Sequence, residues 1–139
     1  MMLKVVYNCN SKNGGKNVYE IVFYEDRNGN SDVEQFIDDL TVRAPRNKDA
    51  RIQLDQMEIT LDRLEQLGPL AGYNFVDKIT KDIWEITPGV NRVLLFLWDG
   101  NKYVLLSHYR KKTGKTTKNE IKKAELRRKD WLERHSKEE

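Results

Sequence analysis

Hydrophobic residues in the first part of the chain follow the pattern of one strand and then one helix. Val18–Tyr24 is rich in β-branched and aromatic residues, which predicts a strand. Phe36, Ile37 and Leu40 share one face of a helical projection, and this helix should end before Pro45. Residues 1–17, upstream of these elements, are expected to hold a short strand and a flexible loop.

A second helix is expected over about Lys48–Leu67, with Gly68-Pro69 directly after it as a typical helix end. Its apolar residues recur at helical spacing: Leu54, Met57, Leu61 and Leu64. Such a stripe can face the core of the protein or form a groove for a partner, and core packing is the more common reason for it.

Two capping boxes mark helix starts. Ser31-Asp-Val-Glu34 precedes the first helix, and Thr117-Lys-Asn-Glu120 opens a C-terminal helix that contains Trp131. In this motif the hydroxyl of the first residue accepts a hydrogen bond from the backbone N–H three positions later.

From Tyr73 the spacing of apolar residues changes to that of strands. The expected strands are Phe75–Val76, Ile83–Ile86, Val90–Trp98 and Tyr103–Tyr109. Their links, such as Pro88-Gly89 and Asp99–Lys102, are short, so consecutive strands should be antiparallel. We predict one α+β domain over residues 1–139, an antiparallel β-sheet meander with two N-terminal helices and a C-terminal helix packed on it.

Composition excludes several classes of protein. Cys9 is the only cysteine, so neither an intrachain disulfide nor a Cys-rich metal site is possible. His108 and His135 lie far apart, and no glycine-rich phosphate loop is present, so we expect no metal and no cofactor. The N-terminal apolar run is too short for a signal peptide, and no stretch suits a membrane span. We therefore expect a cytoplasmic protein that does not enter membranes.

Charge is segregated along the chain, whose formal net charge is +3. Acidic residues dominate between Glu25 and Glu65, and basic residues dominate after His108. One short segment carries the cations Arg110, Lys111, Lys112, Lys115, Lys118, Lys122 and Lys123. A concentrated basic segment at the end of a sheet favours a polyanionic partner, with nucleic acid first, although a solvated loop and helix face would look the same.

Strand pairing predicts a row of polar side chains beside this segment. If Pro88-Gly89 closes a two-residue hairpin, Glu85 lies opposite Arg92. If Gly100-Asn101 closes the next hairpin, Arg92 lies opposite Tyr109. A slip of one residue in either turn would destroy the row, and an exposed Glu–Arg ion pair is the alternative interpretation.

Three segments resemble the HigB branch of the RelE/ParE toxin superfamily: Ile83-Trp-Glu-Ile86, Asn91-Arg-Val-Leu-Leu-Phe96 and His108–Ala124. The resemblance covers about half of the chain. It implies a RelE-like fold and the toxin of a type II toxin–antitoxin pair. Members of the family cleave mRNA, typically in the ribosomal A site. They form a hetero-oligomer with a cognate antitoxin, which for this branch is expected to carry a helix-turn-helix domain.

The resemblance also implies a metal-independent ribonuclease site. Arg92 and Arg110 would contact the scissile phosphate and stabilise the transition state. Tyr109 and His108 are candidates for general acid or base, or for stacking on a base, and a half-buried strand residue is the simpler interpretation of His108. Glu85 would act as a base or only orient Arg92. Lys111 would bind a flanking phosphate or act as a base if its neighbours lower its pKa. The remaining residues expected to bind RNA are Lys112, Lys115, Lys118, Lys78 and Lys81.

The chain departs from the family pattern at Thr87, where arginine is frequent, and at Thr117, which replaces proline. His108-Tyr109 also stands where a Gly-Phe pair is common. Two other functions remain open. One is a ParE-like inhibitor of a cellular target such as gyrase, and the other is a phage-derived nucleic-acid-binding protein. An antitoxin segment is expected to cross the acidic first helices or to plug the cationic site.

Overall fold

The computed structural model describes residues 19–67, 74–112 and 114–136. The strand and loop predicted within residues 1–17 and the predicted helix end at Gly68-Pro69 lie outside these residues. The elements in chain order are β1 (Glu20–Phe23), α2 (Asp32–Arg43), α3 (Lys48–Leu67), β2 (Val76–Lys78), β3 (Trp84–Ile86), β4 (Asn91–Trp98), β5 (Lys102–Arg110) and α4 (Lys118–His135). The predicted strands and helices are therefore confirmed, with ends shifted by one or two residues.

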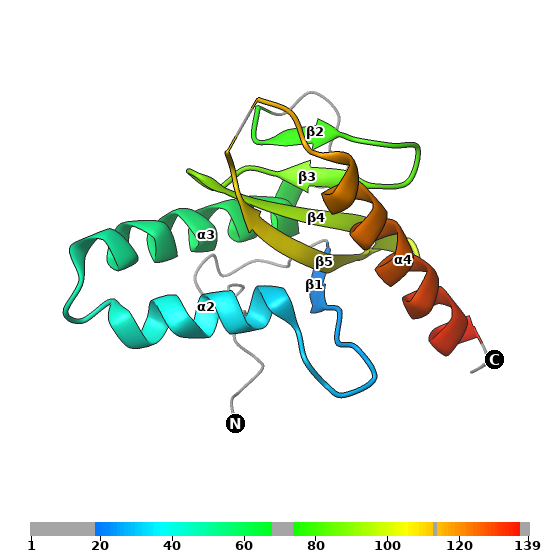
Figure 1. Ribbon diagram of the computed structural model, residues 1–139, viewed down its shortest axis with the longest axis horizontal. Coiled ribbons are helices and arrows are strands. Elements are labelled where there is room, and N and C mark those ends of the chain that lie inside the picture. The colour runs from blue at the N-terminus through cyan, green and yellow to red at the C-terminus, as the bar shows by residue number, and fades with distance from the viewer. Residues whose placement is uncertain (1–18, 68–73, 113, 137–139) are drawn as a thin grey trace.

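The strands form one mixed sheet in the order β1-β5-β4-β3-β2 (Figure 1). The pairs β2–β3, β3–β4 and β4–β5 are antiparallel, as predicted. β1 pairs with β5 in parallel, from Glu20 opposite Lys102 to Phe23 opposite Leu105. The sheet is thus not wholly antiparallel. A parallel edge strand is possible because the long connection through α2 and α3 separates β1 from the meander. β1 covers the edge of β5 that would otherwise be open.

Helices cover both faces of the sheet. α2 and α3 contribute Val33, Met57 and Leu61 to a core cluster with β-strand residues such as Val93 and Leu105. α4 crosses the other face (Figure 1), where Ala124 and Trp131 pack on strand residues that include Leu94, Phe96 and Leu106. We call these two sides the helix-pair face and the α4 face. Adjacent strand residues point to opposite faces, so the assignment of any site residue follows from its position in the strand.

The helix starts follow the two capping boxes. The Ser31 hydroxyl accepts from the Glu34 N–H at 3.1 Å, and the Thr117 hydroxyl accepts from the Glu120 N–H at 3.3 Å. In α3, Met57, Leu61 and Leu64 are fully buried, so the apolar stripe belongs to the core. No helix in the described residues is both long enough and apolar enough to cross a membrane.

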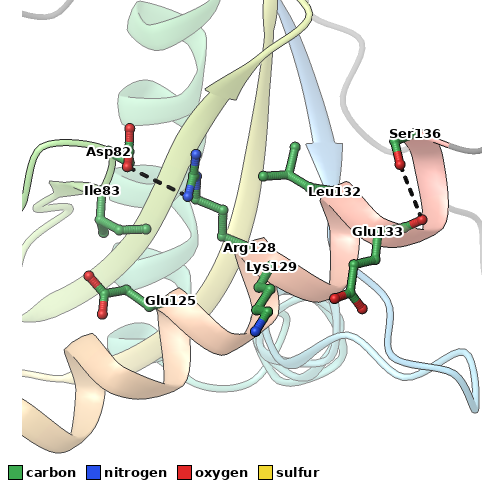
Figure 2. Close-up of a pocket in the computed structure, with 8 residues that line it drawn as sticks. All are labelled: Asp82, Ile83, Glu125, Arg128, Lys129, Leu132, Glu133 and Ser136. Carbon is green, nitrogen blue, oxygen red and sulfur yellow. Dashed lines mark hydrogen bonds and ion pairs between the residues drawn. The ribbon is translucent and has the colours of Figure 1, made fainter.

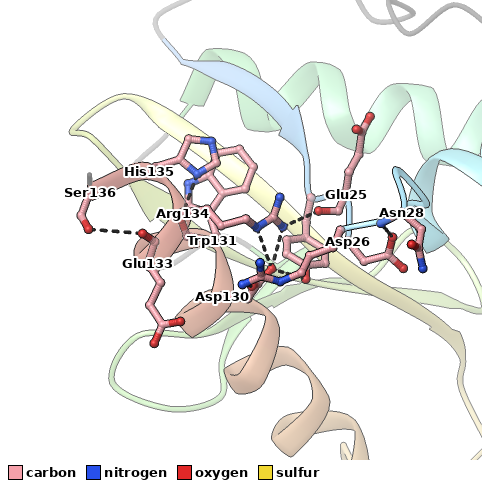
Figure 3. A network of polar contacts seen from close by, with 11 residues as sticks. Glu25, Asp26, Asn28, Asp130, Trp131, Glu133, Arg134, His135 and Ser136 are labelled. Carbon is pink, nitrogen blue, oxygen red and sulfur yellow. Dashed lines mark hydrogen bonds and ion pairs between the residues drawn. The ribbon is translucent and has the colours of Figure 1, made fainter. Parts of the chain in front are cut away.

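The C-terminal half of α4 is fastened to the segment that follows β1 (Figure 3). Asp130 accepts hydrogen bonds from the Tyr24 hydroxyl at 2.7 Å and from the Arg134 guanidinium at 2.6 Å, and Arg134 also donates to the Glu25 carbonyl. The Arg134 hydrogen bond, followed by that of Tyr24, lowers the pKa of Asp130 below its ordinary value. This network fixes one end of α4 on the sheet, while the Thr117 cap defines the other end.

Candidate nucleic-acid site

Arg92 and Tyr109 lie directly opposite each other on β4 and β5, as predicted. The turn before them differs from the expected one, because Trp98 pairs with Lys102 across three residues instead of two. A register shift between Leu94 and Leu95 then offsets the difference of one residue. β-Bulges insert one residue in this way, so the longer turn and the bulge together restore the expected pair.

The predicted pairing of Glu85 with Arg92 is wrong. Glu85 lies opposite Leu94, and Ile86 lies opposite Val93, so the connection between β3 and β4 is longer than a two-residue hairpin. The tight turn sits later, where the Asn91 N–H donates to the Pro88 carbonyl at 3.0 Å. A slip of two residues preserves the alternation of side chains, so Glu85 and Arg92 still point to the same face.

Glu85, Tyr109 and Thr116 form a hydrogen-bonded group on the α4 face, which we call the Glu85 clasp. The Tyr109 hydroxyl donates to Glu85 Oε2 at 2.6 Å, and the Thr116 hydroxyl donates to the same oxygen at 2.9 Å. Only 4% of Glu85 is exposed. A buried carboxylate is costly without donors, so the two hydroxyls stabilise it while it holds both of them in place.

Tyr109 keeps its proton at neutral pH. Burial first, and then the hydrogen bond to Glu85, raise the pKa of Tyr109 to about 12, although the nearby Arg92 charge acts in the opposite direction. Tyr109 is therefore a poor base by itself. The short contact with Glu85 instead allows its hydroxyl to pass a proton to the carboxylate while it accepts another proton.

The basic loop, residues 111–112 and 114–117, is held at both ends. The Lys111 N–H donates to the Val90 carbonyl at 2.8 Å, and Thr116 joins the Glu85 clasp immediately before the Thr117 helix cap. The cations at this end of the sheet are exposed: Arg110, Lys111, Lys112, Lys115 and Lys118. A loop fixed at two points presents its charges in a defined arrangement, which lowers the entropy cost of binding a polyanion.

Arg92 lies beside this loop and is held by backbone oxygens. Its Nη1 donates to the carbonyls of Gly89 and Asn91, both at 2.7 Å. Within the residues that the structure describes, no acceptor contacts its Nε or Nη2. The guanidinium plane is therefore oriented on one side and available to an anion on the other.

His108 lies on the helix-pair face, apart from the Tyr109 hydroxyl. Its ring stacks on Phe36 at 3.7 Å between centroids, and its Nε2 is 2.9 Å from Asn91 Oδ1. Burial, the largest cause, lowers the pKa of His108 to about 4, and the Arg110 charge lowers it further against an opposing effect of Asp32. The ring is neutral at pH 7, and the simpler interpretation as a half-buried strand residue fits this position.

The six residues predicted to be catalytic are thus divided. Glu85, Arg92 and Tyr109 share the α4 face, whereas His108 and Arg110 occupy alternate positions of β5 that face the helix pair. Lys111 follows β5 directly and is exposed. The structure assembles the first three with the basic loop, whereas Arg110 is exposed at the end of β5 on the other face.

The lysines near β2 are elsewhere. Lys78 pairs with Trp84 and places its Nζ 5.5 Å from the centre of that ring. Lys81 lies in the β2–β3 turn, at the opposite end of β3 from the turn that holds Arg92. The structure does not bring these two predicted RNA-binding residues together with the basic loop.

A pocket also lies near the β2–β3 turn, against α4 (Figure 2). Its lining consists of Asp82, Ile83, Glu125, Arg128, Lys129, Leu132, Glu133 and Ser136. Asp82 and Arg128 form an ion pair at 3.6 Å, and the lining contains both acids and bases. Such mixed charge does not concentrate a polyanion, so the basic end of the sheet remains the better candidate site.

Sequence reasoning missed Thr116 and the buried pair Gln53 and Asn91. Thr116 directly precedes the recognisable helix cap Thr117, but the capping motif does not predict where the Thr116 hydroxyl points. The Asn91 amide donates to Gln53 Oε1 at 3.0 Å across 38 positions of sequence, a contact that only the packed structure defines. Gln53 stands among apolar positions of α3, and a polar residue at such a position is the one available signal.

The chain was compared with known families and with curated proteins. A family model described as phage-derived protein Gp49-like (DUF891) matches residues 48–129, from the start of α3 into α4. The match includes Glu85, Arg92, Tyr109 and the whole basic loop. No curated protein matches the chain at a significant level. Because the family model covers more than half of the 139 residues, the chain belongs to the phage-derived Gp49-like family.

Proposed function

We propose that this protein is a HigB-like toxin of a type II toxin–antitoxin pair that cleaves mRNA on the ribosome in the cytoplasm. The family to which it belongs is associated with RelE- and HigB-like toxins. The observation that carries the proposal is the juxtaposition of a proton-transferring pair, Tyr109 and Glu85, with Arg92 and an anchored basic loop. A proton acceptor and a cation at one phosphate each lower the barrier to RNA cleavage.

In the proposed site the cations bind and activate the phosphate. Arg92 offers a planar guanidinium on the α4 face, which suits two phosphate oxygens at once. Lys111, Lys112 and Lys115 hold flanking phosphates, and Arg110 reaches one from the end of β5. Negative charge builds up on the phosphate oxygens as the transition state forms, and donors already in place stabilise it without reorganising.

The proposed chemistry uses the RNA's own nucleophile. The ribose 2′-oxygen forms a bond to phosphorus, the bond from phosphorus to the 5′-oxygen breaks, and a 2′,3′-cyclic phosphate results. The 2′-OH proton passes to the Tyr109 oxygen while the Tyr109 proton moves to Glu85, 2.6 Å away. The departing 5′-oxygen takes a proton from water or from a loop lysine.

The proposed partner is a cognate antitoxin with a helix-turn-helix domain. α2 and α3 carry many carboxylates, among them Glu34, Asp38, Asp39, Asp55 and Glu58. A basic antitoxin segment suits this acidic surface, and an acidic segment suits the basic loop. Either arrangement gives a toxin–antitoxin hetero-oligomer.

Expression of the protein with and without its antitoxin tests the proposal. Transcripts recovered after induction should carry discrete 5′-ends within translated regions, and 3′-terminal cyclic phosphates should appear at the same positions. Purified ribosomes with a defined mRNA should reproduce these ends in the presence of a metal chelator. Arrested replication with intact transcripts would instead favour a gyrase inhibitor. Salt-sensitive RNA binding without growth arrest would favour a simple nucleic-acid-binding protein.

A further inference from the structure

We propose that Gln53 and Asn91 are positioning residues that place the Arg92 guanidinium from the opposite side of the sheet. The inference rests on the role of Arg92 in the proposed function. It adds that α3, which lies on the helix-pair face and does not contact the proposed RNA path, controls the geometry of the principal cation.

The first link is a buried polar relay between α3 and β4. The Gln53 amide donates to Asp49 at 2.7 Å, the Asn91 amide donates to Gln53 Oε1 at 3.0 Å, and His108 Nε2 lies 2.9 Å from Asn91 Oδ1. Gln53 and Asn91 are 7% and 2% exposed. Because Asn91 Oδ1 can only accept, the neutral His108 carries its proton on Nε2, and every polar atom of the Asn91 side chain has a partner.

The second link is the turn between β3 and β4. Gly89 has φ +63° in this turn, which closes through the hydrogen bond from Asn91 N–H to the Pro88 carbonyl. A Cβ atom at Gly89 would stand 2.1 Å from Gln56 Oε1, so the α3 side chain rests against the turn backbone. α3 therefore contacts the turn at two points one helical turn apart, Gln53 and Gln56.

The third link joins the turn to Arg92. The carbonyl oxygens of Gly89 and Asn91 both accept from Arg92 Nη1. Asn91 thus binds α3 through its side chain and Arg92 through its backbone carbonyl. Displacement of Asn91 moves the acceptor that orients the guanidinium, although Arg92 itself is unchanged.

Nuclear magnetic resonance of Arg92 tests this coupling without any RNA. The two hydrogen bonds that Nη1 donates hinder rotation of the guanidinium, so Arg92 should give separate Nη1 and Nη2 signals. The signals that disappear in the Arg92→Lys variant are assigned to Arg92. In Gln53→Leu these signals should merge. Thr60→Val is the matched control, because Thr60 is also 7% exposed on α3 but its hydroxyl donates only to the Gln56 carbonyl. The control should keep separate signals.

Rescue and kinetics separate positioning from simple destabilisation. Gln53→Glu combined with Asp49→Asn reverses one hydrogen bond and preserves the acceptor for Asn91, so the separate signals should return. At saturating RNA, the single-turnover cleavage rate of Gln53→Leu should fall on the order of tenfold to a hundredfold, with Kd changed less than about twofold. Thr60→Val should match the wild type in both quantities.

Separate Arg92 signals in folded Gln53→Leu, or merged signals in the rescued variant, would overturn the inference. Absence of cleavage by the wild type is a different result, because it would reject the proposed function. The Arg92 resonance signals would then still decide whether Gln53 holds Arg92. A rise in Kd by the same factor as the fall in rate would also contradict positioning, since it would mean that Gln53 supports the binding surface as a whole.

Discussion

The Tyr109 hydroxyl donates a 2.6 Å hydrogen bond to Glu85, although β4 runs between the two strands that carry these residues. Both side chains point to the α4 face and reach across β4, and Thr116 adds a third member from the segment before α4. One buried carboxylate therefore ties the sheet to the basic loop. The Glu85 clasp therefore fixes the position of the basic loop, and of its lysines, relative to the sheet.

Thr116→Val should release the basic loop from the sheet. Glu85 would lose one of its two donors, and an under-satisfied buried carboxylate costs about 1–3 kcal/mol of stability. Chemical denaturation measures that loss, and hydrogen exchange of the Lys115 and Lys118 amides should accelerate. Thr117→Ser keeps the α4 cap and serves as control. Unchanged exchange in Thr116→Val would mean that the clasp does not order the loop.

Tyr109→Phe should stop the proposed proton transfer while leaving RNA affinity nearly intact. Because the pKa of Tyr109 is about 12, the cleavage rate should show no ionisation of a phenol between pH 6 and pH 9. The loss of rate should be on the order of 10²–10⁴-fold, as for other general catalysts. Single-turnover cleavage across this pH range measures both. A variant as fast as the wild type would remove Tyr109 from the chemistry.

Gly89→Ala should destabilise the protein by about 1–2 kcal/mol, because an alanine at φ +63° occupies the left-handed region. The clash with Gln56 Oε1 adds less, since the end of that side chain can move. Thermal unfolding measures the change, with Gly29→Ala, at φ +83° in open space, as the control for backbone strain alone. Equal losses would show that contact with Gln56 has no energetic role.

Local sequence patterns predicted the elements well because they depend on nearby residues. Ser31 and Thr117 cap their helices as expected, and the burial of Met57 follows from helical spacing. Pairing of strands depends on turn geometry, which the sequence defines poorly. The Glu85 register was therefore wrong by two residues, yet Glu85 and Arg92 still share one face because side chains alternate with a period of two.

The composition of the candidate site was less predictable than the fold. His108 and Tyr109 are neighbours in sequence, but strand alternation sends them to opposite faces. Thr116 reaches Glu85 only because of how the chain folds back from β5, and Asn91 meets Gln53 only through packing of α3 on the sheet. Contacts between distant residues of this kind leave no local signature.

Stability should fall as pH decreases from about 6.5 to about 4 in a manner that depends on His108. The unfolded histidine binds a proton near pH 6.5, whereas the folded ring, with its pKa lowered to about 4, does not, so acid favours the unfolded chain in this window. The full shift corresponds to roughly 3 kcal/mol, which partial solvation of the ring reduces to about 1–2 kcal/mol. Denaturation of His108→Gln across this pH range should show a smaller slope. An identical slope in both proteins would contradict a buried, neutral His108.

The lysines of the basic loop should dominate the salt dependence of RNA binding. Each phosphate contact contributes about −0.7 to the slope of log K against log salt for a single strand. Lys111→Ala and Lys112→Ala should each reduce the slope by about that amount, whereas Lys81→Ala, at the far end of β3, should leave it unchanged. Titrations of labelled single-stranded RNA at several salt concentrations measure the slopes. An equal effect of Lys81→Ala would place the RNA path across β2 as well.

The most direct test of the central claim is the cleavage of mRNA on purified ribosomes by the wild type and by Arg92→Ala combined with Arg110→Ala. The cations at this end of the sheet are proposed to stabilise the transition state, so the wild type should cut and the double variant should lose at least about a hundredfold in rate while remaining folded. Cutting at equal rates by the two proteins, or no cutting by the folded wild type, would contradict the assignment of this site as a ribonuclease centre.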